Sequence, residues 1–381
     1  KTISGAEGLS LLAIPFFVCA GIFMNYTGVT KRIMNCCEVL TARMPGGLAQ
    51  VNILLSTLMG GLSGSSLADA AMQCKMLVPT MESKGYSKSF STVITAASGM
   101  VVPLIPPGVG LIIYGCINNI SIGKLFIAGI GPGIVLCVTL MIFTHFLSKK
   151  RGYLPSRTTK IPVSEKIAAV RPAFLPLLLP IIIIGGVRIG VFTASEAGTV
   201  AIVYAVLLGL LYKELTLKNV MQGCKETVTT TASIMLIVAA ATCFSWILTK
   251  EQIPQQFSQW MISNIHNKYV FLIMVNIFLL IVGMFIEGNA SMIVLAPLLH
   301  PVAMAYGIDD IHFAMVYIFN CTIGAFTPPM GTLMFVSCGI TKCPTKDFIK
   351  EAVPFYILFA IDIIVLTYIP QLTTFLVNVF Y

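Results

Sequence analysis

The chain is a succession of long apolar stretches separated by short groups of polar or small residues. Residues 174–187, for example, are apolar on every face, and such runs lack the inward and outward alternation of a membrane β-barrel. A bilayer-spanning helix takes about 20 apolar residues, so the stretches leave room for roughly ten spans or half-spans. The pattern predicts an all-α polytopic membrane protein.

The composition supports this prediction. Hydrophobic residues make up 57% of the chain and charged residues only 10%, against about 25% charged residues in soluble domains. A soluble enzyme, a disordered chain and a nucleic-acid binder are therefore excluded. The eleven cysteines form no CxxC pair and the four histidines are scattered, so we predict neither a transition-metal site nor a disulfide framework. The chain opens without a short basic and apolar leader, and we expect no cleavable signal.

The one long polar stretch, residues 148–171, is strongly basic. Glu165 is its only acid, and its cations are Lys149, Lys150, Arg151, Arg157, Lys160, Lys166 and Arg171. Short loops rich in Lys and Arg stay on the cytoplasmic side of a membrane. We therefore predict a cytoplasmic loop at residues 149–172, between two halves of the chain, and binding of anionic lipid is compatible with it as an added role.

The two halves share an internal repeat. A constant offset of 222 residues aligns them without a gap and matches five glycines or prolines: Gly61 with Gly283, Pro79 with Pro301, Gly85 with Gly307, Pro106 with Pro328, and Pro107 with Pro329. In each half a break of small or polar residues, at 60–66 and at 283–291, is followed by a prolyl pair. Proline lacks an amide hydrogen and clashes with the preceding turn, so each pair ends or breaks a helix.

Broken helices in a membrane indicate a transport site. Backbone that leaves the helix at membrane depth must be satisfied by protein or by a water-filled cavity. Paired breaks at matching positions of two halves are typical of secondary transporters, whose site lies at the repeat interface near the bilayer midplane. The repeats are inverted if an odd number of spans separates them. Close packing of small residues and simple prolyl kinks are the alternative explanations.

The breaks also carry suitable chemistry. Helix amino ends receive anions, and freed carbonyl and hydroxyl oxygens are ligands that Na⁺ accepts. We therefore predict that an anion and a cation bind side by side. The candidate substrate-binding residues are Ser63, Ser65, Ser66, Pro106, Glu287, Asn289 and Pro328.

Ionisable residues inside apolar runs cost free energy in a membrane and are functional candidates by default. Glu287 lies at the second break, where lining the site is favoured over a packing role. Asp69 follows the first break and fits a helix start as well as a site. We interpret Glu196, in the first turn of a helix, and Arg188, reaching an interface, as structural. Asp362 is expected to pair with a group on a neighbouring helix or subunit.

Several motifs together resemble the large membrane subunit of tripartite ATP-independent periplasmic (TRAP) transporters. They are residues 12–17 (Leu-Ala-Ile-Pro-Phe-Phe), 60–71, 105–107, 192–197 and 323–331. The resemblance implies a transport domain with two helical hairpins, a surrounding scaffold, an elevator-type movement, Na⁺ coupling and a place in the bacterial cytoplasmic (inner) membrane. It also implies two partners, a small four-helix membrane subunit and a soluble periplasmic substrate-binding protein. Members of the family usually carry one more hydrophobic span before the first motif.

The resemblance further implies at least two Na⁺ sites. Carried over residue by residue, the second site falls on Gly283, Gly324, Thr327 and Met330. The offset of 222 then places Gly61 and Val102 in the first site, with Ser63, Ser66 and Gly99 as further candidates.

The expected fold is an inverted-repeat, elevator-type transporter with two helical hairpins. We divide the chain into scaffold helices (1–45), a first transport repeat with hairpin 1 (46–148), the cytoplasmic basic loop (149–172), scaffold and connecting helices (173–265), a second transport repeat with hairpin 2 (266–345) and a C-terminal scaffold helix (346–381).

Substrates in the family are mostly carboxylated organic anions, including sialic acid and C4-dicarboxylates. Residues 289–292 and 320–322 look more like the sialic acid branch, so we predict Na⁺-coupled import of sialic acid, with a C4-dicarboxylate as the alternative. An intramembrane hydrolase or transferase using Ser63, Ser66 or Asp69 is disfavoured, because nucleophilic catalysis needs a base within reach and no histidine lies in either break. A channel would require a continuous pore instead of an occluded site. We predict no enzymatic activity.

Overall fold

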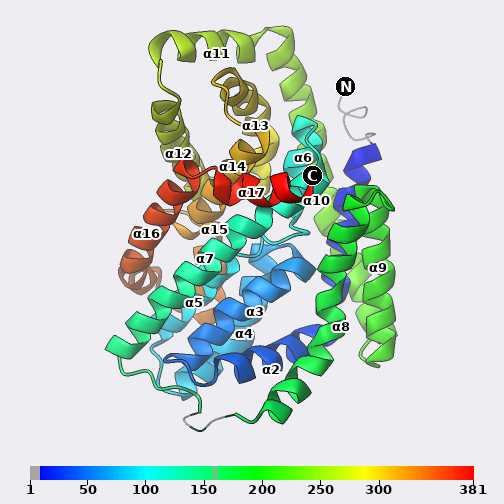
Figure 1. Cartoon of the computed structure of the whole chain (residues 1–381), viewed down its shortest axis with the longest axis vertical. Helices are drawn as coiled ribbons and strands as arrows, with labels where there is room; N and C mark the ends of the chain where they lie inside the picture. Colours follow the sequence, from blue (N-terminus) through cyan, green and yellow to red (C-terminus); the bar gives the residue numbers. More distant parts are fainter. Residues whose placement is uncertain (1–8, 158, 160) are drawn as a thin grey trace.

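The computed structural model describes residues 9–157, 159 and 161–381. In these residues it contains one 3₁₀ turn, Leu9–Leu12, seventeen α-helices and no strand, as the all-α prediction requires (Figure 1). The helices of the first half are α1 (Ala13–Asn25), α2 (Val29–Thr41), α3 (Gly47–Ser63), α4 (Ser66–Ser83), α5 (Lys88–Gly99), α6 (Val109–Asn118) and α7 (Ile122–Lys150). Those of the second half are α8 (Val163–Arg188), α9 (Ala194–Leu211), α10 (Leu217–Lys250), α11 (Ile253–Asn264), α12 (Lys268–Phe285), α13 (Gly288–Ala305), α14 (Asp310–Phe326), α15 (Thr332–Thr341), α16 (Thr345–Tyr368) and α17 (Gln371–Phe380).

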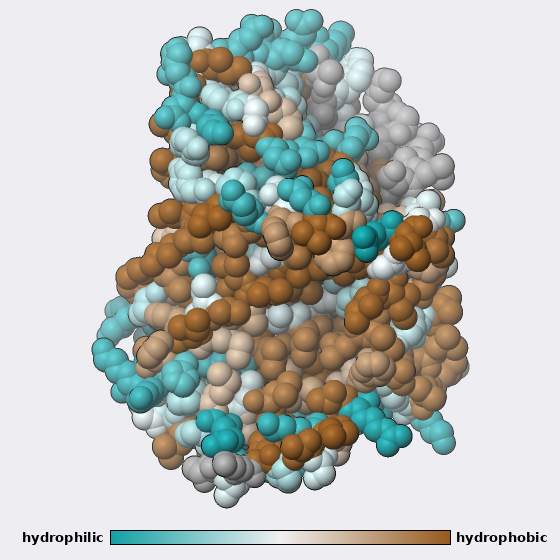
Figure 2. Space-filling model, viewed as in Figure 1, coloured by the Kyte–Doolittle hydropathy of each residue, from teal (hydrophilic) through white to brown (hydrophobic). Residues whose placement is uncertain are grey.

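The outer helices present an apolar surface. Six of the described helices are long and apolar enough to cross a membrane, and the number is eight if each of two bent helix pairs counts as one span. Ile181 on α8, Leu207 on α9 and Leu236 on α10 are examples of exposed apolar side chains. Figure 2 shows hydrophobic residues spread over the middle and lower parts of one face. Water would disfavour such a surface, whereas lipid tails accommodate it.

The internal repeat is visible in the helix boundaries. Helices α3 and α4 form hairpin 1, whose tip is residues 64–65, and α12 and α13 form hairpin 2, whose tip is residues 286–287. Helix α4 begins at Ser66 and α13 at Gly288, again 222 positions apart. In each half the hairpin is followed by a helix, a prolyl pair and a shorter helix, in the order α5 and α6 or α14 and α15. The helix breaks predicted from the sequence therefore all occur.

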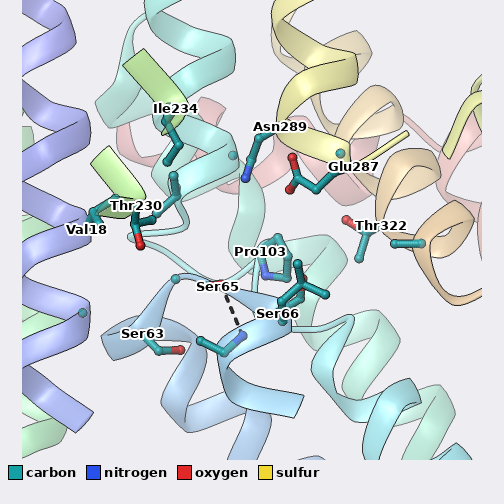
Figure 3. A pocket seen from close by; sticks show the side chains of 18 of the residues that line it. Val18, Ser63, Ser65, Ser66, Pro103, Thr230, Ile234, Glu287, Asn289 and Thr322 are labelled. Atoms are coloured by element: carbon teal, nitrogen blue, oxygen red, sulfur yellow. Dashed lines mark hydrogen bonds between the residues drawn. The ribbon is translucent and has the colours of Figure 1, made fainter. Parts of the chain in front are cut away.

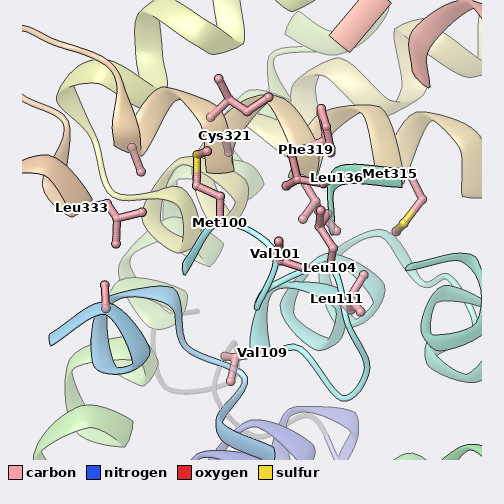
Figure 4. Close-up of a cluster of buried hydrophobic side chains, with 14 of the residues drawn as sticks. Met100, Val101, Leu104, Val109, Leu111, Leu136, Met315, Phe319, Cys321 and Leu333 are labelled. Carbon is pink, nitrogen blue, oxygen red and sulfur yellow. The ribbon is translucent and has the colours of Figure 1, made fainter. Parts of the chain in front are cut away.

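The two hairpins approach the middle of the molecule from opposite sides, hairpin 1 from the lower half of Figure 1 and hairpin 2 from the upper half. Helices α5 and α14 form the most deeply buried part of the structure, because residues 90–99 and 311–326 are all buried. The segment that follows α5 packs its apolar side chains, Met100 and Leu104 among them, near Phe319 of α14 (Figure 4). This rigid centre fixes the positions of the two tips.

Two predicted segments differ from the structure. The basic segment at 149–172 is a loop only between the end of α7 at Lys150 and the start of α8 at Val163, and its Lys160 lies outside the described residues. The loop is fastened to the turn between α2 and α3, because the amide of Gly46 donates to the carbonyl of Tyr153 (3.1 Å) and the amide of Arg157 to that of Ala42 (2.9 Å). Residues 346–381 form parts of two helices, α16 and α17, bent by 49°, instead of one.

Candidate functional site

The tips of the two hairpins line one central cavity of about 170 Å³. Five of the residues predicted to bind substrate are part of its wall: Ser63, Ser65 and Ser66 from hairpin 1, and Glu287 and Asn289 from hairpin 2. Figure 3 shows the three serines on one side of the cavity and the two hairpin 2 residues on the other. Segments about 220 positions apart in the sequence are thus brought together.

The tip of hairpin 1 is formed by Gly64. Helix α3 ends there because Gly64 adopts a left-handed conformation (φ 62°), which suits glycine. A Cβ at this position would lie only 3.0 Å from the carbonyl oxygen of Pro107. Ser65 then begins α4, and its hydroxyl accepts a 3.4 Å hydrogen bond from the amide of Ala68. The Gly64 carbonyl accepts from the amide of Val109 (3.4 Å), which joins the tip to α6.

The tip of hairpin 2 is capped by an acid. Glu287 is the residue before α13, and its Oε2 accepts a 3.1 Å hydrogen bond from the amide of Ala290. The amide of Asn289 also contacts this carboxylate. A carboxylate at a helix amino end is stabilised by the free amides and by the helix dipole. Glu287 is therefore held in place by backbone at the edge of the cavity.

Two further helix amino ends reach the same cavity. Val109 and Gly110 at the start of α6, and Thr332 at the start of α15, line it. The residues before these helices, Gly108 and Gly331, provide no side-chain cap. Four helix amino ends, those of α4, α6, α13 and α15, therefore converge on one space. The amino end of α13 already holds the Glu287 carboxylate. The partial positive charges of the other three ends, those of α4, α6 and α15, favour a negatively charged occupant.

The remaining walls come from helices that lie outside the two hairpins. Helix α1 contributes Asn25 among others, α10 contributes Thr230, and α14 contributes Thr322. Helix α1 packs tightly on hairpin 1, because a Cβ at Gly21 would lie 2.6 Å from the carbonyl oxygen of Ser63. Sequence reasoning missed these polar residues. Their only signal was a polar side chain inside an apolar helix, which many packing residues share.

The two prolines predicted to bind substrate, Pro106 and Pro328, are not among the residues that line the cavity. Pro106 instead supports hairpin 1 from behind, since its carbonyl oxygen lies 3.1 Å from the place of a Cβ at Gly61. Each prolyl pair links a buried helix to the short helix whose amino end reaches the cavity.

The residues of the first implied Na⁺ site gather around the backbone of hairpin 1. A Cβ at Gly60, next to Gly61, would lie 3.2 Å from the carbonyl oxygen of Val102, and one at Gly99 would lie 3.3 Å from that of Ser66. Main-chain carbonyls of α4 and of the segment after α5 are therefore close to these glycines.

Part of the second implied Na⁺ set is also close together. Gly283 and Gly324 are in backbone contact, since a Cβ on Gly324 would lie 2.6 Å from the Cα of Gly283. The amide of Thr327 donates to the Gly324 carbonyl (2.9 Å), and Met330 is 56% exposed. In the described part of the chain no cluster of three or more His, Cys, Asp or Glu residues could hold a metal ion. A cation here would be bound by carbonyl and hydroxyl oxygens.

Four other ionisable residues lie outside the cavity wall. The Asp69 side chain is buried between α3 and α4, and Ser65, not Asp69, caps α4. Glu196 forms a capping box with Thr193, as predicted for a first-turn acid. Asp362 accepts a 3.0 Å hydrogen bond from the hydroxyl of Thr139 on the neighbouring α7. Arg188 donates to the carbonyl of Phe380 at 2.8 Å.

The fold and the cavity define a helical membrane protein of the transporter class, built from two related hairpins. Comparison with known proteins identifies the family. The family model of the tripartite ATP-independent periplasmic transporter, DctM component, matches residues 1–372, and the chain belongs to this family. It is therefore the large permease of a bacterial TRAP transporter, a multi-pass membrane protein and not an enzyme.

The chain is similar to two relatives over nearly its whole length. It is 40% identical to the sialic acid TRAP transporter large permease protein SiaM of Vibrio cholerae, across all of this chain and 89% of that protein. It is 36% identical to the C4-dicarboxylate TRAP transporter large permease protein DctM of Pseudomonas aeruginosa, across 99% of this chain and 88% of that protein. The fold resembles the crystal structure of the Alcanivorax borkumensis YdaH transporter, with a TM-score of 0.64 and 13% identity over 96% of this chain and 86% of that one.

Proposed function

We propose that the protein imports a carboxylated organic anion across the bacterial inner membrane, with sialic acid the favoured substrate and a C4-dicarboxylate the alternative. The observation that carries this proposal is the convergence of the amino ends of α4, α6 and α15, none of which is capped by a carboxylate, on one cavity between the hairpin tips. A carboxylate binds such ends through free amides and the helix dipole. The 40% identity to a sialic acid permease favours sialic acid over the other substrates of the family.

The import is driven by Na⁺ in this proposal. Glycine backbones in close contact and the nearby hydroxyl of Thr327 offer hard oxygen ligands beside both tips. Binding of Na⁺ next to the anion would offset the negative charge of the substrate, so that both cross the membrane together. Gly61, Val102, Gly283, Gly324 and Thr327 are the proposed centre of the two sites.

The movement is proposed to be of the elevator type. Hairpins 1 and 2, with α5, α6, α14 and α15, would form the moving unit, and α1, α2, α8, α9 and α10 would belong to the scaffold. A TRAP large permease works with a small membrane subunit and a periplasmic binding protein. In this assembly we propose that the small subunit covers part of the exposed apolar surface of the scaffold and that the binding protein delivers the solute.

Counterflow in proteoliposomes tests this function. The chain is reconstituted with its small subunit, sialic acid is loaded inside, and uptake of labelled sialic acid is measured with the binding protein outside. We expect uptake that requires Na⁺. The Thr327→Ala variant should need several-fold more Na⁺ for half-maximal uptake, because the ion loses one coordinating oxygen, and a loss of about 1 kcal/mol weakens binding several-fold.

The matched control is Thr341→Ala. The Thr341 hydroxyl makes the same bond to the carbonyl four residues earlier (2.8 Å) as that of Thr327 (2.8 Å), but it lies at the far end of α15. Its Na⁺ titration should match that of the wild type. Uptake that is independent of Na⁺ would contradict the proposed coupling, and equal titrations for both variants would remove Thr327 from the site.

A further inference from the structure

The two hairpin tips that face the cavity are chemically unequal. The tip of hairpin 1 presents the uncharged residues Ser63, Gly64, Ser65 and Ser66. The tip of hairpin 2 presents Glu287, the only charged residue in the described wall of the cavity. The repeat therefore does not produce two equivalent anion sites. A solute that bridges the tips meets one end that accepts an anion and one end that already holds a carboxylate.

The tip of hairpin 1 is equipped to receive a carboxylate. It is the amino end of α4, a helix of 18 residues, where the first amides have no partner within the helix. The second observation is Ser63, which is only 8% exposed and whose hydroxyl has no hydrogen-bond partner although it lines the cavity. A buried hydroxyl without a partner is costly, so it is expected to donate to an occupant of the cavity.

The carbonyl end of α3, which would repel an anion, is largely covered. The Ser63 carbonyl lies against α1 at Gly21, and the Gly64 carbonyl accepts from the Val109 amide at 3.4 Å. The amide of Gly64 in turn donates to Gly60 at 3.3 Å. The two carbonyls of the tip that would repel an anion therefore face other backbone groups, and the amino end of α4 is the part of hairpin 1 offered to an anionic solute.

The tip of hairpin 2 suits hydrogen-bond donors of a solute and not a second carboxylate. The Glu287 carboxylate already occupies the amino end of α13, where the Ala290 amide donates to it at 3.1 Å. A carboxylate is an acceptor and pairs with hydroxyl, amide or ammonium donors of a solute. A second carboxylate placed beside it would be repelled, and no Lys or Arg lines the described cavity to offset that repulsion.

From this asymmetry we propose that Glu287 determines substrate selectivity. The cavity takes a solute with a single carboxylate, which binds the amino end of α4 and Ser63, and whose other end carries hydroxyl, amide or ammonium groups that donate to Glu287. Dicarboxylates are disfavoured by the same residue. This inference rests on the proposed function and specifies its substrate class. Asn289, next to Glu287 in Figure 3, and Thr230, beside Val18 on another side of the cavity, provide further polar groups for a hydroxylated solute.

Binding to the purified pair of membrane subunits tests the inference without the binding protein, which would impose its own selectivity. The shift of the thermal unfolding midpoint is titrated at fixed Na⁺ with sialic acid, as the hydroxylated monocarboxylate, and with succinate, as the dicarboxylate. We expect the wild type to bind sialic acid at least about tenfold more tightly than succinate. In Glu287→Gln this ratio should fall by about tenfold, because the repulsion of succinate is removed and the hydroxyl groups lose a charged acceptor.

Three variants control the measurement. Glu287→Asn provides an uncharged residue that still caps a helix, and it should reproduce the lost selectivity if Glu287→Gln does not fold. Ser63→Ala should weaken the binding of sialic acid and of succinate by the same several-fold factor, so the ratio of their affinities should not change. Glu251→Gln, on an exposed residue between α10 and α11, is the matched control and should behave as the wild type.

The outcomes separate the inference from the proposed function. A wild type that binds succinate as tightly as sialic acid, or a folded Glu287 variant with an unchanged ratio, would overturn the role of Glu287 while leaving anion transport in place. A wild type that shows neither binding of any carboxylate nor counterflow would overturn the proposed function, and the inference with it.

Discussion

At the scale of single residues, the carboxylate of Asp69 shows how a charge is accommodated inside hairpin 1. Its side chain is buried, and Oδ2 accepts hydrogen bonds from the Ser56 hydroxyl (2.7 Å) and the Gln73 amide (2.8 Å). Gln73 also donates to Ser56 at 2.7 Å. These groups join α3 to α4 through polar contacts. In a membrane interior, hydrophobic burial does little to hold two helices together, so such bonds matter for the shape of the hairpin.

Removing the acceptor should therefore loosen hairpin 1. In Asp69→Ala, the buried donors of Ser56 and Gln73 lose a partner, and we expect a destabilisation of about 1–3 kcal/mol. The measurement is the thermal unfolding midpoint of the purified protein, which should fall by several degrees. Asp69→Asn keeps an oxygen that accepts from the same donors, so it should stay close to the wild type. Equal midpoints for all three proteins would show that the network contributes nothing to stability.

At the scale of helices, close approach depends on two glycines at the point where α12 crosses α14. Helices α12 and α14 touch through Gly283 and Gly324, where a Cβ on Gly324 would lie 2.6 Å from the other backbone. Backbone atoms cannot move aside as a side chain can. The two glycines thus set the distance between hairpin 2 and the most buried helix of the structure.

A methyl group at this crossing should force the helices apart. We expect Gly324→Ala to be destabilised by about 1–3 kcal/mol, as is typical of overpacking. The matched control is Gly339→Ala on α15, where a Cβ would have nothing within 4 Å and alanine favours the helix. Thermal unfolding is measured without Na⁺, so that altered ion binding does not contribute. A midpoint of Gly324→Ala equal to that of the control would contradict the close contact.

The sequence predicts the hairpins well because glycine and proline act locally. The break at Gly64 follows from its left-handed backbone, and the end of α14 at Phe326, just before Pro328 and Pro329, follows from the missing amide hydrogens. Helix α5 ends earlier than its prolyl pair requires, at Gly99. The other cavity walls could not be predicted in this way. Helix α1 is apolar on most faces, and Thr230 of α10 is one of four threonines between residues 227 and 231, so no periodic pattern indicates that Asn25 and Thr230 point inward.

The role of Asp69 could not be predicted either, for a different reason. An acid three residues after a helix break has the same sequence signature whether it caps the helix, binds a solute or accepts hydrogen bonds from a neighbouring helix. The distinction depends on Ser56, which lies one helix earlier and faces it only in the folded hairpin. Side-chain pairing across helices is set by the packing of the hairpin as a whole.

At the scale of the whole molecule, the contacts between the hairpins and the surrounding helices are the ones that an elevator movement would have to break. Thr30 on α2 donates to the sulfur of Met72 on α4 at 3.6 Å. A Cβ at Gly61 on α3 would lie 2.6 Å from Pro180 on α8. By contrast, the hydroxyls of Thr92 on α5 and Thr341 on α15 bond at 3.0 Å within the proposed moving unit. If the movement occurs, a cross-link between hairpin 1 and the scaffold should stop transport, whereas a cross-link within the moving unit should not.

Cross-linking distinguishes them. In a background whose native cysteines are replaced, the double substitution Thr30→Cys and Met72→Cys connects the scaffold to hairpin 1, and Thr92→Cys with Thr341→Cys connects two parts of the moving unit. After treatment with a short bifunctional thiol reagent, counterflow by the Thr30→Cys and Met72→Cys variant should fall to background. The Thr92→Cys and Thr341→Cys variant should keep most of its counterflow activity. A reagent with a cleavable disulfide allows recovery after reduction to be checked. If the scaffold cross-link forms completely and transport continues, hairpin 1 does not move relative to α2, because a rigid tether between moving bodies cannot coexist with their displacement.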